Sequence, residues 1–260
     1  MRRLILEEPV SRAAVYSRRL AVFAGLTAAV GIVVARAGGG HDMLGALSVF
    51  AAALLLAGLA LLLAGAATVE IWTTGRRGVV PAGAGAALAL LLLAYPLFLT
   101  LKAATLPRIN QVTTDFRSVP TYMISSKARE ARGAWTPPLP GPEVEAAQRA
   151  AYPRIQPMLV DLEPEQAYRM ALRIAKDLGW RVVDANPPNL RGEAEAHIDA
   201  TDRTLFFNFV DDIAIRIRAA GAKTQIDVRS ASRIGRHDFG ANAKRVQRFI
   251  DAVQESVEAR

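Results

Sequence analysis

Three long stretches without a charged residue constrain this chain of 260 residues more than any other feature. Residues 43–69 and 79–101 each exceed the roughly 20 residues that a helix needs to cross a hydrocarbon core about 30 Å thick. Residues 20–35 are shorter, but arginines flank them on both sides, and such side chains extend to the lipid headgroups. The sequence therefore predicts three membrane-spanning helices within residues 1–104.

The first stretch has an alternative interpretation as a cleaved secretion signal. A basic segment precedes it, and Ala35-Arg36-Ala37 resembles a small-residue cleavage site. Two further spans already anchor the chain in the membrane, so a cleaved signal is not needed to explain the apolar content. We therefore expect a first span rather than a removed signal.

The placement of lysine and arginine predicts the orientation of the spans. Five arginines precede the first span and Arg76 and Arg77 lie between the second and third, whereas only Arg36 lies between the first and second. Positive residues accumulate in cytoplasmic loops, so the N-terminus is predicted to be cytoplasmic. Three spans then place the C-terminal part in the periplasm of a bacterium, with the chain in the inner membrane.

Charge and cysteine content narrow the classes of partner. The net charge of +8 divides evenly between the membrane region and the rest, and no nucleic-acid-binding motif accompanies it. We therefore expect contact with membrane lipids, and with an anionic ligand or an envelope protein, but not with nucleic acid. The absence of cysteine excludes disulfides and thiolate chemistry, and no cofactor fingerprint occurs, so no cofactor and no metal are expected.

Proline dominates the segment that follows the spans, residues 105–162. It contains eight prolines, which lack an amide donor and fix φ. The segment is predicted to be extended, with one short helix over residues 143–151.

Residues 163–260 alternate between helical and strand patterns and predict a soluble α+β domain. A helix begins near Pro164 and ends at Gly179, and a second follows Asp238 as its N-cap. Strand patterns between the helices cover 180–183, 190–198, 204–209 and the two arms of 213–230. The predicted fold class is a membrane-anchored α+β protein, in which three transmembrane helices precede an antiparallel sheet of about five strands covered by two helices.

The two arms of residues 213–230 predict a β-hairpin of defined register. Isoleucines and valine alternate with charged residues, and the apolar sides coincide if Gly221-Ala222 is a two-residue type II′ turn. In that register Arg216 faces Asp227 directly, and Asp212 lies diagonal to Arg229. These four residues are predicted to form structural charge pairs.

Several segments of the domain resemble the uncharacterised family called domain of unknown function 1499. The resemblance rests on residues 209–212, 216–218 and 227–245, with Val112-Thr113-Thr114-Asp115 as an N-terminal motif. It covers about residues 107–250. Members of that family are bacterial envelope and plastid proteins without an assigned activity, so the resemblance implies a domain and no chemistry.

The loop that leads into the last helix is the strongest candidate for ligand binding. Arginine forks bind phosphate and carboxylate groups, and free amides at a helix N-terminus attract anions. The candidate anion-binding residues are Arg229, Ser230, Ser232, Arg233, Arg236, His237, Asp238 and Asn242. A structural alternative pairs Arg216 and Arg229 with Asp212 and Asp227 and leaves the polar side chains to bond the loop backbone.

A catalytic alternative uses acidic residues of the same region. Asp211, Asp212 and Asp238 with His237 would supply oxygen ligands for a metal ion or an acid–base pair. Neighbouring residues of a strand point to opposite faces, which separates Asp211 from Asp212. The prediction for function is therefore a non-enzymatic envelope module that binds a lipid, glycan or protein partner, with a hydrolase-like envelope enzyme as the alternative.

Overall fold

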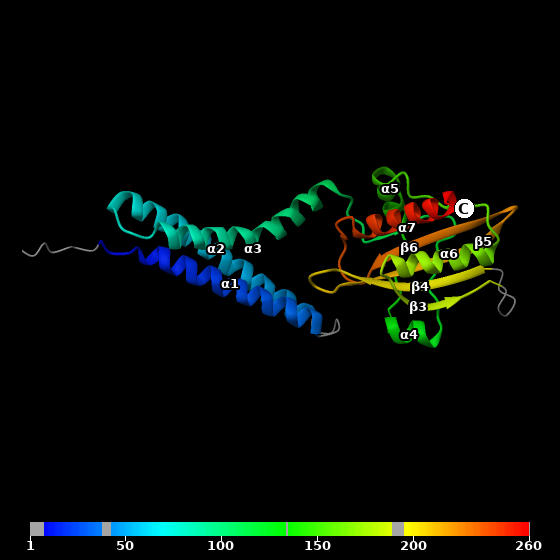
Figure 1. Cartoon of the computed structure of the whole chain (residues 1–260), viewed down its shortest axis with the longest axis horizontal. Helices are drawn as coiled ribbons and strands as arrows, with labels where there is room; N and C mark the ends of the chain where they lie inside the picture. Colours follow the sequence, from blue (N-terminus) through cyan, green and yellow to red (C-terminus); the bar gives the residue numbers. More distant parts are fainter. Residues whose placement is uncertain (1–7, 38–42, 134, 189–194, 260) are drawn as a thin grey trace, which may run out of the picture. The chain divides into compact units, whose positions relative to one another are not determined.

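The structure, a computed structural model, describes residues 8–37, 43–133, 135–188 and 195–259. It divides into two compact units (Figure 1). The first contains residues 1–101 with 206–208, and the second contains residues 102–205 with 209–260. Each unit has its own packing.

Three helices make up the first unit: α1 (Arg12–Ala37), α2 (Met43–Thr74) and α3 (Val79–Thr105). All three are long and apolar enough to cross a membrane, as predicted. Their buried positions are almost all alanine, glycine or serine, whereas leucines such as Leu44 and Leu62 are exposed. Small residues let helix backbones approach closely, and a methyl group at Gly85 of α3 would collide with Ser17 of α1.

The start of α1 is tied to the turn between α2 and α3. The Ser11 amide donates to the carbonyl of Arg77 at 2.8 Å, and the Ser11 hydroxyl donates to Glu70 at 2.6 Å. Arg76 forms an ion pair with the same Glu70 carboxylate. The N-terminal segment and the second turn therefore lie at the same end of this helix group, as the predicted orientation requires.

The second unit is built on one antiparallel sheet of six strands, in the order β1-β6-β5-β4-β3, with β2 also pairing with β6. The strands are β1 (Gln111–Thr113), β2 (Met158–Val160), β3 (Arg181–Asn186), β4 (Glu195–Arg203), β5 (Val210–Ala220) and β6 (Lys223–Ser232). The predicted fold class is confirmed. The sheet has one strand more than the expected five.

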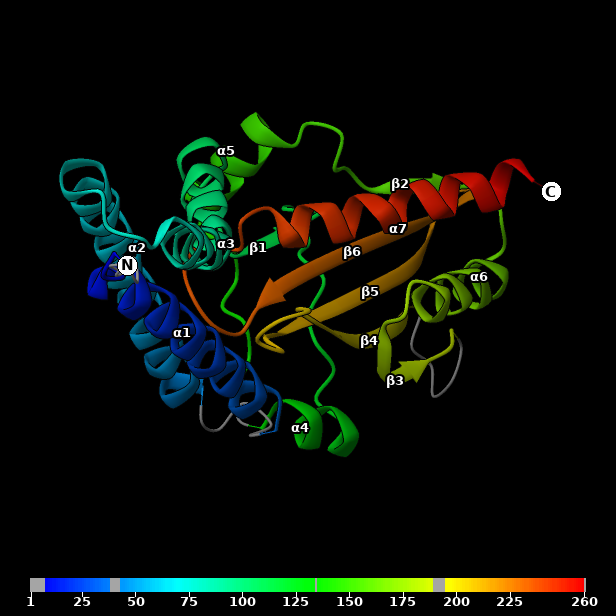
Figure 2. The ribbon, with the colours of Figure 1, turned by 60° about the vertical axis from the view of Figure 1, so that its left-hand side comes forward.

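One face of the sheet is apolar and packs against two amphipathic helices (Figure 2). Helix α7 (Ala241–Glu258) lies along β6, and α6 (Pro164–Asp177) contacts β3, β4 and β5. Isoleucines of β4, β5 and β6 are fully buried there, and Trp180 stacks on Phe249 with ring centroids 5.5 Å apart. Burial of this face drives the folding of the domain.

The predicted hairpin forms in the predicted register. Ala220 pairs with Lys223 across the two-residue turn, and Gly221 takes φ of 65°, which glycine adopts without strain. Arg216 pairs directly with Asp227.

The strand predicted over residues 204–209 is wrong. This segment is the turn that joins β4 to β5, closed by a hydrogen bond from the Thr204 amide to the Phe209 carbonyl. Asn208 adopts a left-handed φ of 57°, and Phe206 is exposed. The aromatic residues favour a strand locally, but pairing of Arg203 with Val210 requires the chain to reverse between them. Part of another predicted strand, residues 190–194, falls outside the described residues.

The proline-rich segment contributes four short elements to the second unit. These are β1, α4 (Ser126–Arg132), α5 (Pro142–Ala151) and β2. Both strands pair with β6, β1 near its end and β2 near its start. These two strands were not predicted from the sequence. Because the strand predicted over residues 204–209 is absent, the sheet has six strands instead of five. The domain boundaries drawn from the sequence stay a prediction.

Candidate functional site

The second face of the sheet is charged, and most of its charges are buried. We call this the charged face; it carries Asp199, Asp212, Arg216, Asp227 and Arg229, each at most 5% exposed. Arg216 donates to Asp227 at 2.8 Å and to the Ser118 carbonyl at 2.7 Å. Arg216 and Asp227 therefore form a buried ion pair. The segment that follows β1 covers this face and supplies many of its partners.

Arg229 differs from its predicted pairing. It donates to the Gln111 side chain at 2.7 Å and to the Pro138 carbonyl at 2.6 Å, and it lies over the Tyr122 ring. Asp212 instead binds Arg233 through two hydrogen bonds of 2.7 and 2.8 Å. Asp212 faces Ala231, so Arg229 and Arg233 are both diagonal neighbours, and the structure uses the second. Burial lowers the pKa of Arg229.

Helix α4 is fastened to the charged face by Asp199. This carboxylate accepts from the Arg132 guanidinium at 2.5 Å and from the Met123 amide at 2.9 Å. Burial raises the pKa of Asp199 to about 6, although the hydrogen bond from Arg132 and its positive charge oppose that change. Burial also raises the pKa of Tyr122, whose hydroxyl donates to the Asp212 carbonyl at 3.2 Å.

The polar residues of the predicted anion-binding loop mostly bond one another. Ser230 donates to Asn242 at 2.7 Å, and Asn242 donates to Ser232 at 2.9 Å. The Asp238 carboxylate accepts from the amides of Gly240 at 2.9 Å and Asn242 at 3.0 Å. The N-cap of α7 is Gly240 and not the predicted Asp238, whose carboxylate lies two residues earlier and still binds the first turn through the Asn242 amide. The amides of Gly240, Ala241 and Asn242, which were expected to attract an anion, are thus bonded within the protein.

The residues of the catalytic alternative do not converge. Asp211 binds Arg245 of α7 at 2.7 Å, on the apolar side of the sheet, while Asp212 binds Arg233 on the charged face. The His237 ring accepts the Phe239 amide at 2.9 Å. Among the residues that the structure describes, Arg236 is exposed and has no hydrogen bond or ion pair. The anion-binding hypothesis for the loop stays a prediction.

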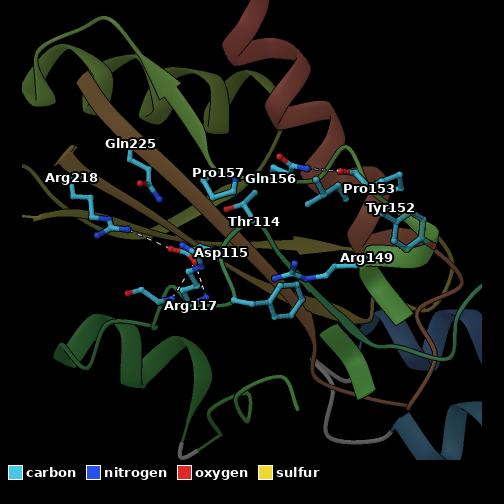
Figure 3. Close-up of a pocket in the computed structure, with 13 residues that line it drawn as sticks. Thr114, Asp115, Arg117, Arg149, Tyr152, Pro153, Gln156, Pro157, Arg218 and Gln225 are labelled. Carbon is cyan, nitrogen blue, oxygen red and sulfur yellow. Dashed lines mark hydrogen bonds and ion pairs between the residues drawn. The ribbon is translucent and has the colours of Figure 1, made fainter. Parts of the chain in front are cut away.

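A groove of about 750 Å³ lies beside the charged face (Figure 3). We call it the arginine groove. The loop after β1, the end of α5 with the chain that follows it, and strands β5 and β6 form its walls. Its lining residues are Thr114, Asp115, Phe116, Arg117, Ser118, Arg149, Tyr152, Pro153, Ile155, Gln156, Pro157, Arg218 and Gln225.

A buried glutamine places the α5 wall of the arginine groove. The Gln148 side chain accepts the Thr113 amide at 3.0 Å and donates to the Thr113 carbonyl at 2.7 Å. It therefore pairs with the outer edge of β1 as a neighbouring strand would. Helix α5 is fixed to the sheet by this contact, and Arg149 and Tyr152 border the groove (Figure 3).

Asp115 places the opposite loop. One carboxylate oxygen accepts the amides of Arg117 at 2.8 Å and Ser118 at 3.1 Å. The other lies 3.3 Å from Arg216 and 3.4 Å from Arg218. The negative charge of Asp115 is thus compensated inside the protein. It holds the loop in place and leaves the groove with a positive surface.

Three arginines give the groove its positive surface. Arg117 is exposed and forms no side-chain hydrogen bond or ion pair with any described residue. Arg149 is 66% exposed, binds Glu145 at 2.6 Å and lies 5.8 Å from the Phe116 ring centroid. The Arg218 side chain is 33% exposed. Arginine forks beside an aromatic ring suit a phosphate or carboxylate ligand with a less polar body.

Sequence reasoning missed the arginine groove as a site. Its residues come from four segments between residues 114 and 225, and no short motif joins them. The one sequence feature that could have indicated the groove was the Thr114-Asp115 pair, which was noticed only through the family resemblance. Its spacing gives no information about Arg149 or Arg218, because pairing of β1 with β6 and docking of α5 bring these residues together.

Fold and groove define a protein with three candidate membrane spans and one antiparallel α+β domain. Residues 135–253 match the family model described as Protein of unknown function (DUF1499), which confirms the resemblance over that range. The match begins at Trp135, so the motif at 112–115 lies outside it. Comparisons with curated proteins and with solved structures found no match.

Proposed function

We propose that this chain is a bacterial inner-membrane protein that holds an anion-binding α+β domain in the periplasm. The three N-terminal helices are its membrane anchor, and its N-terminus is cytoplasmic. The domain acts as a binding module of the envelope rather than as an enzyme. Its ligand is a lipid, glycan or protein group that carries phosphate or carboxylate.

The arginine groove is the observation that carries this proposal. Its volume of about 750 Å³ lies within the range of roughly 300–1,000 Å³ that is usual for small-molecule sites. Three arginines border it against one aspartate, and that aspartate is bonded to Arg216 and Arg218. Phe116, Tyr152 and neighbouring prolines supply apolar surface for the body of the ligand.

Two of the three arginines of the groove, Arg117 and Arg149, are available to a ligand at low cost. Arg117 has no side-chain partner among the described residues that a ligand would have to displace. Arg149 pairs with Glu145, and both residues are exposed and one helical turn apart. Such pairs contribute only about 0.3–0.5 kcal/mol, so a ligand anion can replace Glu145. The loop residues Ser230, Ser232 and Asn242 by contrast already bond one another.

Binding of a simple anionic probe tests the proposal. The full-length protein in phosphatidylcholine nanodiscs is titrated with glucose 6-phosphate, and the dissociation constant is measured by ligand-observed NMR. We expect weak binding that weakens further as salt is added, because exposed charges are screened. Arg117→Ala should raise the dissociation constant about tenfold, the effect of losing one charge-assisted contact.

Two matched controls locate the site. Arg236→Ala removes an exposed arginine from the predicted anion loop and should leave the dissociation constant unchanged. Arg149→Ala should weaken binding, whereas Arg169→Ala should not, although both arginines are 66% exposed and pair with a glutamate four residues earlier. Loss of binding in Arg236→Ala alone would move the site to the loop. Absence of binding to the unaltered protein would contradict the proposal.

A further inference from the structure

The chain that leaves α3 packs at once against the loop between β6 and α7. A Cβ atom at Gly240 would lie 3.1 Å from Leu106, the residue that follows α3. The Asp238 amide donates to the Ile109 carbonyl at 3.0 Å, and the Asn110 side chain donates to the Gly235 carbonyl at 2.8 Å. The loop is therefore held by residues next to the end of a candidate span.

Chain length limits how far this loop can lie from the end of α3. Asn110 follows Thr105, the last residue of α3, by five positions. A fully extended chain covers at most about 3.6 Å per residue, so Asn110 lies within roughly 18 Å of that helix end. The Asn110 side chain donates to the Gly235 carbonyl at 2.8 Å, so the loop lies at most about one side-chain length beyond this limit.

Apolar and basic side chains are exposed on and beside the loop. Ile234 is 47% exposed, and Arg108 and Arg236 are exposed without a described side-chain partner. Trp135 is half-buried, and the Arg233 guanidinium lies 5.9 Å from its ring centroid. The nearest acidic group of the loop, Asp238, is buried under its capping hydrogen bonds.

We propose that Arg108, Trp135, Ile234 and Arg236 form a membrane-contact patch that rests on anionic lipid headgroups. Tryptophan is enriched at the interface between membrane and water, and an exposed isoleucine inserts between headgroups. Arginines near an anionic surface add electrostatic attraction to this contact. The short tether to α3 keeps the patch close to that surface, so binding costs little translational entropy. This patch is separate from the arginine groove.

The absence of cysteine from the chain makes the proposal directly testable. A nitroxide label on Ile234→Cys reports the surroundings of the patch in the full-length protein. Leu159→Cys is the matched control, because Leu159 is an exposed aliphatic residue (58%) on β2, which pairs with the opposite end of β6. Both proteins are placed in phosphatidylglycerol nanodiscs, and collision of the label with oxygen and with an aqueous nickel complex is measured.

The label at residue 234 should show a gain in oxygen collisions and a loss of nickel collisions relative to the label at 159. The double change Arg108→Ala/Arg236→Ala should remove this shift, and Arg169→Ala/Arg173→Ala, an equal loss of charge on α6, should retain it. Phosphatidylcholine discs should also reduce it. A label at 234 that is as water-exposed as that at 159 overturns the proposal, and so does a shift of equal size in both lipids. Neither result bears on sugar-phosphate binding in the groove.

Discussion

Arg216 and Asp227 form the most completely buried ion pair of the charged face, with side chains 6% and 0% exposed. Charges removed from water are costly unless each is well bonded. Arg216 also reaches Asp115 and Ser118, and Asp227 accepts two hydrogen bonds from Gln225. This set of partners compensates the loss of water around both side chains.

Removal of one member of this pair should therefore be strongly destabilising. We expect Asp227→Ala to lower the free energy of unfolding by about 3–5 kcal/mol, because Arg216 remains buried without its main counter-charge. Arg216→Ala/Asp227→Ala should lose less than the two single changes together. Thermal unfolding of the full-length protein in detergent measures the three variants.

The exposed pair Arg169–Glu165 is the control for this double-mutant cycle. Its coupling should not exceed about 0.5 kcal/mol, because both side chains remain in water. Strict additivity of Arg216→Ala and Asp227→Ala would show that the two residues do not interact.

For single residues, the sequence pattern predicts the strand register better than it predicts which side chains bind one another. Alternation of apolar and charged residues places Arg216 opposite Asp227, because a slip by one position would expose the isoleucines. The same register leaves Arg229 and Arg233 as equivalent diagonal neighbours of Asp212. The choice depends on the segment around Pro138, which binds Arg229, and nothing in the hairpin predicts it.

At the scale of elements, periodicity identifies the long pieces and fails for the short ones. Helices α6 and α7 and the β5–β6 hairpin have enough repeats to show their apolar side. Strands β1 and β2 have three residues each, too few for any period. Their pairing with β6 is decided by tertiary contacts, such as the insertion of Gln148 against β1.

Asp199 of β4, which binds Arg132 at the end of helix α4, provides a test of how burial affects a carboxyl group. The folded-state pKa of Asp199 is raised to about 6 from the usual 3.8, so the folded protein binds a proton at this group more tightly than the unfolded chain. Stability from this group is full below the unfolded pKa and is lost as the pH rises through about 6.

Comparison of the unaltered protein with Asp199→Asn isolates this effect, because asparagine does not titrate. The melting temperature of the unaltered protein relative to Asp199→Asn should be higher at about pH 5 than at about pH 7.5. Asp251→Asn, at an exposed position of α7, should show no such trend. A difference that grows in the opposite direction would mean that Arg132, rather than burial, dominates the environment of Asp199.

At the scale of the whole molecule, the orientation of the chain is the main prediction. Seven arginines in the N-terminal segment and second turn, against one in the first loop, predict a cytoplasmic N-terminus. The contacts of Ser11 with Arg77 and Glu70 agree that these two segments share one side.

Reporter fusions at the C-terminus measure the orientation. Alkaline phosphatase joined after Arg260 should be active, and green fluorescent protein at the same position should stay dark, because each folds on only one side of the membrane. The reverse pattern would place the domain in the cytoplasm and require either an even number of spans or a periplasmic N-terminus.

The pairing of Gln148 with β1 has a consequence for molecules crowded in one membrane. An unpaired strand edge offers a row of donors and acceptors to the same strand of a neighbouring copy, which is how sheets grow into aggregates. Proteins confined to two dimensions collide side by side far more often than proteins in solution. By occupying both backbone groups of Thr113, one amide side chain closes this edge at the position where another copy would add a strand.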